Sequence, residues 1–329
     1  KYPYRGERFD ELVTESYRES AGTEAHDFYE WMSEAYSRCH ARFPGKESLG
    51  LEELLVAVRQ ELNGIADVSK RTTAEIELSA WLHKLIKTII PRFSLQRGYE
   101  FHHAVKHGER QCLLQSVVIA SLLQDMGVDA GVVMVYRNVH GQEINNGHAV
   151  ALVKLPDGKD ILVEASDPEP FVHHEGLFGR YQGYRYAEPV YEENSSKISH
   201  YNPASGSAKI YPDQFRPLDF SFLRSQFWYY RGERARGGIL SPHKTAEGLQ
   251  GSARCLETSV RFCPSNPLSV YMLGRVYLLQ GRVGQAQELL ETAYKLYSRY
   301  GWVPEGPKQY LASAKRAAGR HVPSRSRHL

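Results

Sequence analysis

The chain has 329 residues, of which 42% are hydrophobic and 24% are charged, and its formal net charge is +3 at pH 7. This composition is ordinary for a globular protein of two or three domains, and the charge is too small to indicate a nucleic-acid partner. No apolar run is long enough to span a membrane, and four scattered cysteines give no disulfide framework. Because the first residues also lack the apolar core of a signal peptide, we expect a cytoplasmic protein.

Residues 1–95 are predicted to form a helical N-terminal region. Apolar residues recur at three- and four-residue spacing in four stretches, at 9–17, 24–43, 51–63 and 73–90. Pro44, Gly64 and Pro91 fall where three of these stretches end. We expect the last helix to pack against the core that follows it.

His102, His103 and His107 lie between this region and the core. His103 and His107 are four residues apart, so they share a helix face and form a conceivable metal pair. No Glu lies between them as in a zinc protease, and no third ligand is evident. The sequence therefore predicts a solvated or packing role for these histidines, with no metal site and no cofactor.

The core domain, residues 96–240, is organised around Cys112. Apolar side chains recur at helical spacing from residue 112 to residue 126, and Gly127 is a natural stop signal. A thiol at a helix start faces backbone N–H groups and the positive end of the helix dipole, and both favour the nucleophilic thiolate. The alternative is an inert thiol that only fills space in a buried helix.

Three strands are predicted after this helix, at 130–139, 148–155 and 160–166. The sequence Pro-Asp-Gly-Lys at 156–159 joins the last two, and Asp-Gly is a strong hairpin signal. If Asp and Gly are the two loop residues, His148 faces Asp167 across the hairpin on one side of the sheet. A thiol, a histidine and a carboxylate that orients the histidine are the parts of a thiol catalytic triad. The alternative for His148 is a structural role in the strand.

The order of these residues, with Cys at a helix start, His at a strand start and Asp before Pro, resembles the transglutaminase-like superfamily, a papain-like group of thiol enzymes. The matching segments are 108–116, 122–133, 147–150 and 167–168. The resemblance implies an α+β core in which the Cys helix packs on an antiparallel sheet, with Cys112, His148 and Asp167 as the triad. The chain departs from the family at Val150, where an aromatic residue is common.

Three groups are candidates for stabilising the oxyanion of such a reaction. The backbone N–H of Cys112 lies at the helix start, and Gln111 is its neighbour in the chain. Transglutaminases often draw a further donor from an aromatic residue upstream of the Cys, and Trp81 has that place in this sequence. The alternative for Trp81, which we favour, is a position in the core.

The rest of the core domain, residues 171–235, is rich in Tyr, Phe, Gly and Pro. Such a segment could complete the sheet with short strands and then cross to the next domain. Its tyrosines and arginines either form a peptide-binding rim or cover the core.

Residues 241–318 carry a helical repeat. With Pro267 as the first position, small and large residues recur as in the 34-residue tetratricopeptide repeat, at Leu273, Gly274, Tyr277, Gly281, Ala286, Leu290 and Ala293. A degenerate copy is predicted before this unit, with Leu240 where the helix contact needs a small residue, and a capping helix at 302–318 after it. Residues 319–329 are predicted to be a basic disordered tail.

Together these features predict an α+β thiol enzyme of acyl-transfer type that acts on a protein or peptide amide, as a transglutaminase, protease or deamidase. The repeats usually hold peptides or partner proteins, so we expect them to help to bind the substrate or a protein partner. The alternative function is a catalytically dead transglutaminase-like scaffold that binds proteins through its repeats.

Overall fold

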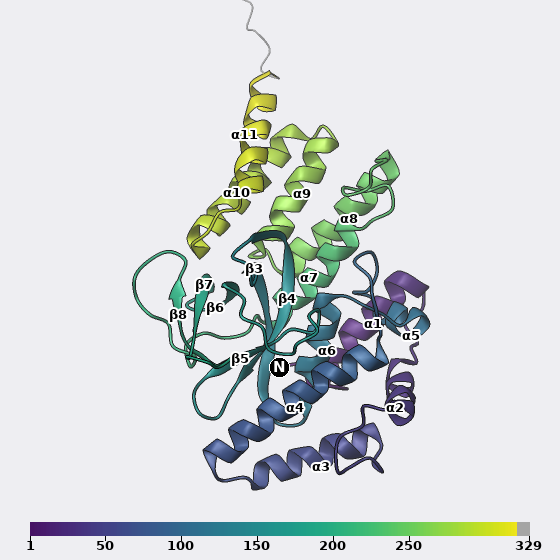
Figure 1. The fold of residues 1–329 in the computed structure, drawn as a ribbon. Coiled ribbons are helices and arrows are strands. Elements are labelled where there is room, and N and C mark those ends of the chain that lie inside the picture. Colours follow the sequence, from purple (N-terminus) through teal and green to yellow (C-terminus); the bar gives the residue numbers. More distant parts are fainter. Residues whose placement is uncertain (321–329) are drawn as a thin grey trace, which may run out of the picture. The chain divides into compact units, whose positions relative to one another are not determined.

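The computed structural model describes residues 1–320, so the predicted basic tail lies almost wholly outside the described residues. The chain forms two compact units, Lys1–Phe220 and Ser221–Leu329. The first unit mixes helices with strands, and the described part of the second is helical, so the fold is α+β as expected (Figure 1). The predicted N-terminal region and core domain thus lie in one unit, and the second, helical unit begins before residue 241, where the repeats are predicted to start.

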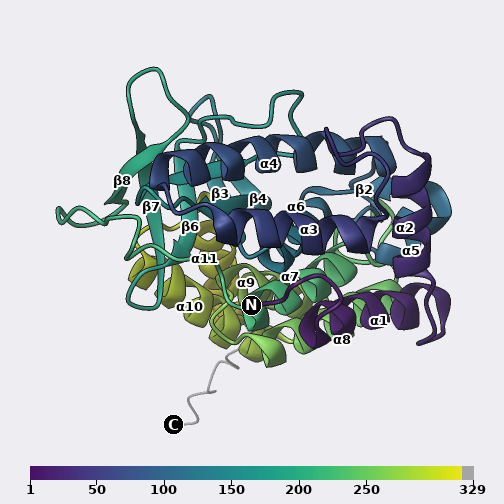
Figure 2. The ribbon, with the colours of Figure 1, turned by 90° about the horizontal axis from the view of Figure 1, so that it is seen from below.

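The four helices predicted before residue 95 are all present. The helices of the first unit are α1 (Glu7–Ala21), α2 (Phe28–Arg38), α3 (Leu51–Gly64), α4 (Val68–Ile89), α5 (Phe101–His107) and α6 (Cys112–Asp125). Helix α4 begins earlier than predicted because the Asp67 side chain caps it, accepting a hydrogen bond from the Lys70 N–H at 2.8 Å. Figure 2 shows α3 and α4 running side by side, as they do in Figure 1.

Six strands of the first unit close into an antiparallel barrel in the order β3-β4-β5-β8-β7-β6. They are β3 (Asp129–Arg137), β4 (Glu143–Lys154), β5 (Asp160–Val163), β6 (Gly176–Arg180), β7 (Tyr184–Tyr191) and β8 (Ile198–Pro203), and a short parallel pair is formed by β1 (Arg92–Phe93) and β2 (Glu109–Arg110). The Tyr-rich segment supplies β6, β7 and β8. The sequence therefore predicts the short completing strands correctly, but not the closure of the sheet.

The Cys helix lies between the barrel and the N-terminal helices. Every residue of α6 from Cys112 to Leu123 is buried, and the helix contacts β3 and β4 on one side and α4 on another. The Ser116 hydroxyl donates to the Ala149 carbonyl of β4 at 3.0 Å, which ties the helix to the strand next to His148. Helix α6 thus packs on the antiparallel barrel, and α4 packs against α6 and β5.

The hairpin between β4 and β5 differs from the prediction in its register. Lys154 pairs with Asp160, and the Leu155 N–H donates to the Lys159 carbonyl at 2.8 Å, so the loop has three residues and not two. Gly158 ends this loop with φ +79°, the left-handed conformation that a three-residue hairpin loop requires. A shift of one residue turns each side chain to the other face of the sheet, so the predicted pairing of His148 with Asp167 across the hairpin is wrong.

The second unit consists of packed helices. They are α7 (Phe220–Glu233), which starts at the last residue of the first unit, and α8 (Ala246–Phe262), α9 (Pro267–Leu279), α10 (Val283–Tyr300) and α11 (Glu305–Arg320). Helices α9 and α10 form the predicted pair, and α11 is the predicted capping helix. Over the described residues, no helix combines the length and the apolar character that crossing a membrane requires.

Helices α7 and α8 also form a close pair, but α7 does not lie where the 34-residue spacing places the first helix of the predicted degenerate copy. A Cβ atom added at Gly232 of α7 would lie 2.6 Å from Leu256 Cγ of α8, just as one added at Gly274 of α9 would lie 2.8 Å from Leu290 Cγ of α10. Gly232 is therefore the small residue at the contact. The predicted residue, Leu240, is exposed in a loop inserted between α7 and α8, and this insertion displaces the pattern.

This packing predicts that Gly274→Val destabilises the second unit. The added side chain must displace Leu290, and overpacking of this kind typically costs about 1–3 kcal/mol. Gly284→Val is the matched control, because no atom lies within 4 Å of a Cβ added there. Urea unfolding of the two variants should give a clearly lower free energy of unfolding for Gly274→Val, and equal values would contradict the close helix contact.

Candidate active site

Cys112 is the first residue of α6, as the sequence predicts. Its side chain is buried, with 5% of its surface exposed. Gln111 caps the helix, and its Oε1 accepts a hydrogen bond from the Leu113 N–H at 3.0 Å. The sulfur therefore lies in the first turn of a long helix, close to the positive end of the helix dipole.

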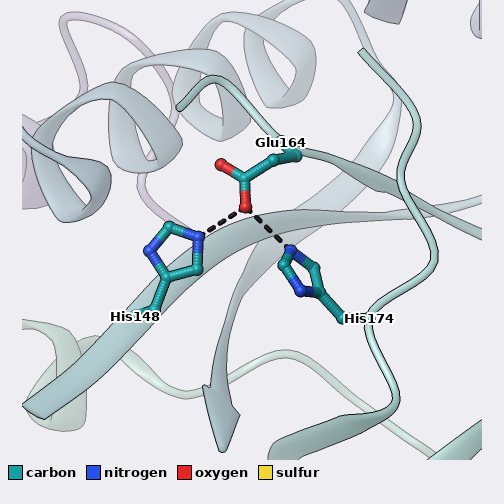
Figure 3. Close-up of side chains that lie close together, drawn as sticks. All are labelled: His148, Glu164 and His174. Atoms are coloured by element: carbon teal, nitrogen blue, oxygen red, sulfur yellow. Dashed lines mark hydrogen bonds and ion pairs between the residues drawn. The ribbon is translucent and has the colours of Figure 1, made fainter. Parts of the chain in front are cut away.

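The structure brings His148 of β4 to this thiol. The imidazole makes hydrogen bonds with two partners, the Cys112 side chain and the Glu164 carboxylate. Nε2 is the ring nitrogen that contacts Glu164 Oε2, and the other ring nitrogen points away from this carboxylate (Figure 3). We therefore assign Nδ1 as the nitrogen that serves Cys112.

Glu164 is the carboxylate of the site, and it follows directly on β5. Its Oε2 accepts hydrogen bonds from Nε2 of His148 and, at 2.8 Å, from Nε2 of His174 (Figure 3). Its Oε1 accepts a hydrogen bond from the Ser166 N–H at 2.8 Å. Burial raises the pKa of Glu164, but the hydrogen bonds with the two histidines outweigh it and hold this pKa well below its usual range. Glu164 is therefore an ionised carboxylate with a full set of donors.

The charge of His148 is set by the same contacts. Burial disfavours the imidazolium, but the hydrogen bonds with Cys112 and Glu164 more than offset it and raise the pKa of His148 to about 10. At neutral pH the ring is thus a cation between a sulfur and a carboxylate. A cation next to a cysteine favours the thiolate form.

Asp167, the predicted orienting carboxylate, does not contact His148 in this structure. Its Oδ1 accepts a hydrogen bond from the Glu169 N–H at 3.0 Å, and its backbone carbonyl accepts from His83 at 3.0 Å and from Lys87 at 2.5 Å, both on α4. Asp167 therefore holds the turn after β5 against α4. The three-residue hairpin loop is the reason, because it moves the residue opposite His148 by one position.

A chain of hydrogen bonds connects the Cys helix to Glu164, through the buried Gln115 and the exposed Ser166. Gln115, one turn along α6 from Cys112, donates from Nε2 to the Ser166 hydroxyl at 2.6 Å, and the N–H of Ser166 holds Glu164. Arg110 donates from Nε to Oε1 of Gln115 at 2.9 Å and so fixes the amide. Helix α6 and the carboxylate are thus positioned relative to each other by direct hydrogen bonds.

The structure settles one of the two roles considered for Trp81. Its indole N–H donates to the Ala41 carbonyl at 2.9 Å, and its ring packs edge-on against Phe43. Trp81 is therefore a core residue whose donor is already used, in agreement with the alternative that we favour. Gln111 stays next to Cys112, where Oε1 caps the helix and leaves the amide Nε2 as the donor that its side chain could offer.

Sequence reasoning missed Glu164 and His174. A three-residue hairpin loop places Ser166 opposite His148 and Glu164 two residues away on the same face of the sheet, so the correct loop length would have pointed to Glu164; His174 lies in a loop and no pattern marks it. The ring of His103 stacks against that of His107 at 5.4 Å, and within the described residues no third metal ligand joins this pair. Comparisons with known proteins add no identification, because no family model and no curated protein matches the chain.

The raised pKa of His148 predicts how the stability of the protein depends on pH. A folded-state pKa of about 10, above the ordinary 6.5, means that protonated His148 stabilises the fold fully below pH 6.5. This contribution is lost as the pH rises from 6.5 towards 10. The difference in free energy of unfolding between wild type and His148→Gln should shrink over that range in urea titrations. A difference that does not change with pH would contradict the buried imidazolium.

Proposed function

We propose that the protein is a thiol enzyme of acyl-transfer type in which Cys112, His148 and Glu164 form the catalytic triad. The observation that carries the proposal is the placement of one imidazole between the Cys112 thiol at a helix start and a buried, ionised carboxylate. Nucleophile, base and orienting group are the three parts that such chemistry needs. The proposal keeps two of the residues predicted from the sequence and replaces Asp167 by Glu164.

The first half of the reaction would run as follows on these residues. The Cys112 thiolate attacks the carbonyl carbon of an amide, and a C–S bond forms while the carbonyl oxygen gains the negative charge. The N–H groups of the first turn of α6, that of Cys112 among them, are the nearest donors for this oxygen. As the C–N bond breaks, His148 gives its proton to the departing amine, which leaves a thioester on the sulfur.

The second half returns the enzyme to its starting form. Neutral His148 removes a proton from water or from a second amine as that molecule attacks the thioester carbonyl. The C–S bond then breaks, and the thiolate leaves next to the imidazolium that has just formed. Glu164 serves both halves, because its fixed negative charge stabilises the imidazolium each time it appears. Water gives a protease or deamidase, and an amine gives a transglutaminase.

We further propose that the substrate is a protein or peptide. The α9–α10 pair has the small-residue contact expected of tetratricopeptide-type repeats, which commonly bind peptides. Binding far from the scissile bond is an established way to position a reacting group. If the Cys112 thiol reacts slowly, without assistance from His148, the result would favour the alternative function, a catalytically dead scaffold.

Two neighbouring carboxylates test which residue orients His148. Glu164→Gln and Asp167→Asn make the same chemical change, but only the first removes the charge that contacts the imidazole. We expect wild-type Cys112 to react rapidly with iodoacetamide at pH 7, and Glu164→Gln to slow this reaction by up to about 30-fold. The reason is that an unassisted thiol is only a few per cent thiolate at pH 7. Asp167→Asn should stay within about 2-fold of wild type.

The measurement follows alkylation of the Cys112 peptide by mass spectrometry, with the melting temperature of each variant recorded alongside. Cys112→Ala identifies the signal, because it removes the reactive peptide without touching the other three cysteines. A larger loss in Asp167→Asn than in Glu164→Gln would return Asp167 to the triad. Slow alkylation of the wild type itself would favour the scaffold.

A further inference from the structure

The proposed chemistry leaves one residue of the site without a task. Cys112, His148 and Glu164 complete a triad, yet His174 also directs Nε2 at Oε2 of Glu164, from 2.8 Å (Figure 3). His174 is 5% exposed, and its backbone carbonyl accepts a hydrogen bond from the Tyr191 hydroxyl at 2.9 Å. A second histidine is thus buried and fixed where the carboxylate already has a partner.

The donor atoms of this cluster form a set that metals use. One nitrogen of His148, one of His174 and a carboxylate oxygen of Glu164 all lie within 4.8 Å of one another. Two imidazole nitrogens with one carboxylate oxygen are typical ligands of Zn²⁺, whereas Ca²⁺ and Mg²⁺ prefer oxygen alone. Three protein ligands leave the fourth position of a tetrahedral ion to water.

We propose that His148, Glu164 and His174 form a binding site for Zn²⁺ or a similar divalent ion. Bonds of 2.0–2.2 Å in tetrahedral geometry place ligand atoms roughly 3.3 Å apart. The 2.8 Å between Nε2 of His174 and Oε2 of Glu164 therefore has to widen by about half an ångström, and the shorter contact of His148 Nε2 with the same oxygen has to widen more. Oε1 of Glu164 can keep its hydrogen bond with the Ser166 N–H, which holds the carboxylate in place while Oε2 binds the ion.

Metal binding and thiol catalysis exclude each other at this site, an inference that rests on the proposed function. When Zn²⁺ takes Nε2 of His148, the proton on Nε2 is released to solvent and the proton of the neutral ring stays on Nδ1. Nδ1 is the nitrogen that we assign to Cys112. A ring locked in this form has no lone pair with which to remove a proton from water, so the thioester can no longer be resolved. Zn²⁺ is thus an inhibitor of turnover.

The binding test uses the full chain and Zn²⁺ in competition with a chromophoric chelator. We expect one Zn²⁺ per chain, and at least about 100-fold weaker binding in His174→Gln, since loss of even an outer-shell partner of a metal ligand costs 10–100-fold. His173→Gln is the matched control: it removes the adjacent histidine, whose ring stacks on Tyr191 and lies outside the cluster. This variant and Cys112→Ala should bind Zn²⁺ as the wild type does.

Several results of this titration would contradict the proposed metal site. If folded His174→Gln binds Zn²⁺ as tightly as the wild type, the cluster is not the site, and loss of binding in Cys112→Ala would place the ion on the thiol. If the melting temperature shows that His174→Gln does not fold, His148→Gln provides the same test. His148 is the more exposed ligand, with 19% of its side-chain surface accessible. Zn²⁺ binding that is undetectable at millimolar concentration also refutes the proposal.

The inhibition test uses p-nitrophenyl acetate. Zn²⁺ should leave the initial burst of nitrophenol, which reports acylation of Cys112, and suppress the steady rate that follows by at least 10-fold. His174→Gln should escape this suppression, with each variant compared with its own metal-free rate. A wild type without Cys112-dependent turnover would refute the proposed function while the binding titration still decides the metal site. A steady rate that Zn²⁺ does not change would refute the inhibition.

Discussion

The site depends on one imidazole, that of His148, which forms hydrogen bonds with a thiol and with a carboxylate at the same time. Burying a cation is costly, and it is tolerated only where opposite charge and hydrogen bonds repay the lost hydration. Here Cys112 and Glu164 do so together, and they raise the pKa of His148 to about 10 against the effect of burial. Both partners thus stabilise the charged form of the ring, and the arrangement holds only while all three side chains keep their places.

The fold supplies those places from three separate elements. Helix α6 is buried on all sides, so the sulfur at its start cannot move without disturbing the barrel and α4 together. Strand β4 carries the ring and is tied to α6 by the contact of Ser116 with Ala149. The turn after β5 carries Glu164, and Gln115 reaches from α6 to fix that turn. The barrel is therefore a rigid support for a site at its junction with the helices.

The sequence predicts the parts of this structure that local chemistry determines. Periodic apolar residues and Gly127 are enough to place Cys112 at the start of a buried helix, and the Asp-Gly turn is enough to predict a hairpin beginning near His148. The length of the loop is not encoded so simply, because Asp157-Gly158 fits both two- and three-residue loops. That single residue turns Asp167 away from the face of His148 and places Ser166 opposite the ring, with Glu164 two residues away on the same face. His174 could not be predicted at all, since the fold and not a local pattern brings its loop to the carboxylate. In the helical second unit, the same limit applies to Leu240, which lies in the loop between α7 and α8 and not at the helix contact.

We infer that His148 is a cation because of Cys112, and ring ¹⁵N nuclear magnetic resonance tests this inference most directly. The spectrum of His148, followed from pH 5 to pH 11, distinguishes the imidazolium from the neutral ring and gives the pKa of the group. We expect the wild-type ring to be protonated on both nitrogens at pH 7, with a pKa of about 10 that falls when Cys112 is replaced by Ala. A neutral ring at pH 7, or the same pKa in wild type and Cys112→Ala, would contradict it.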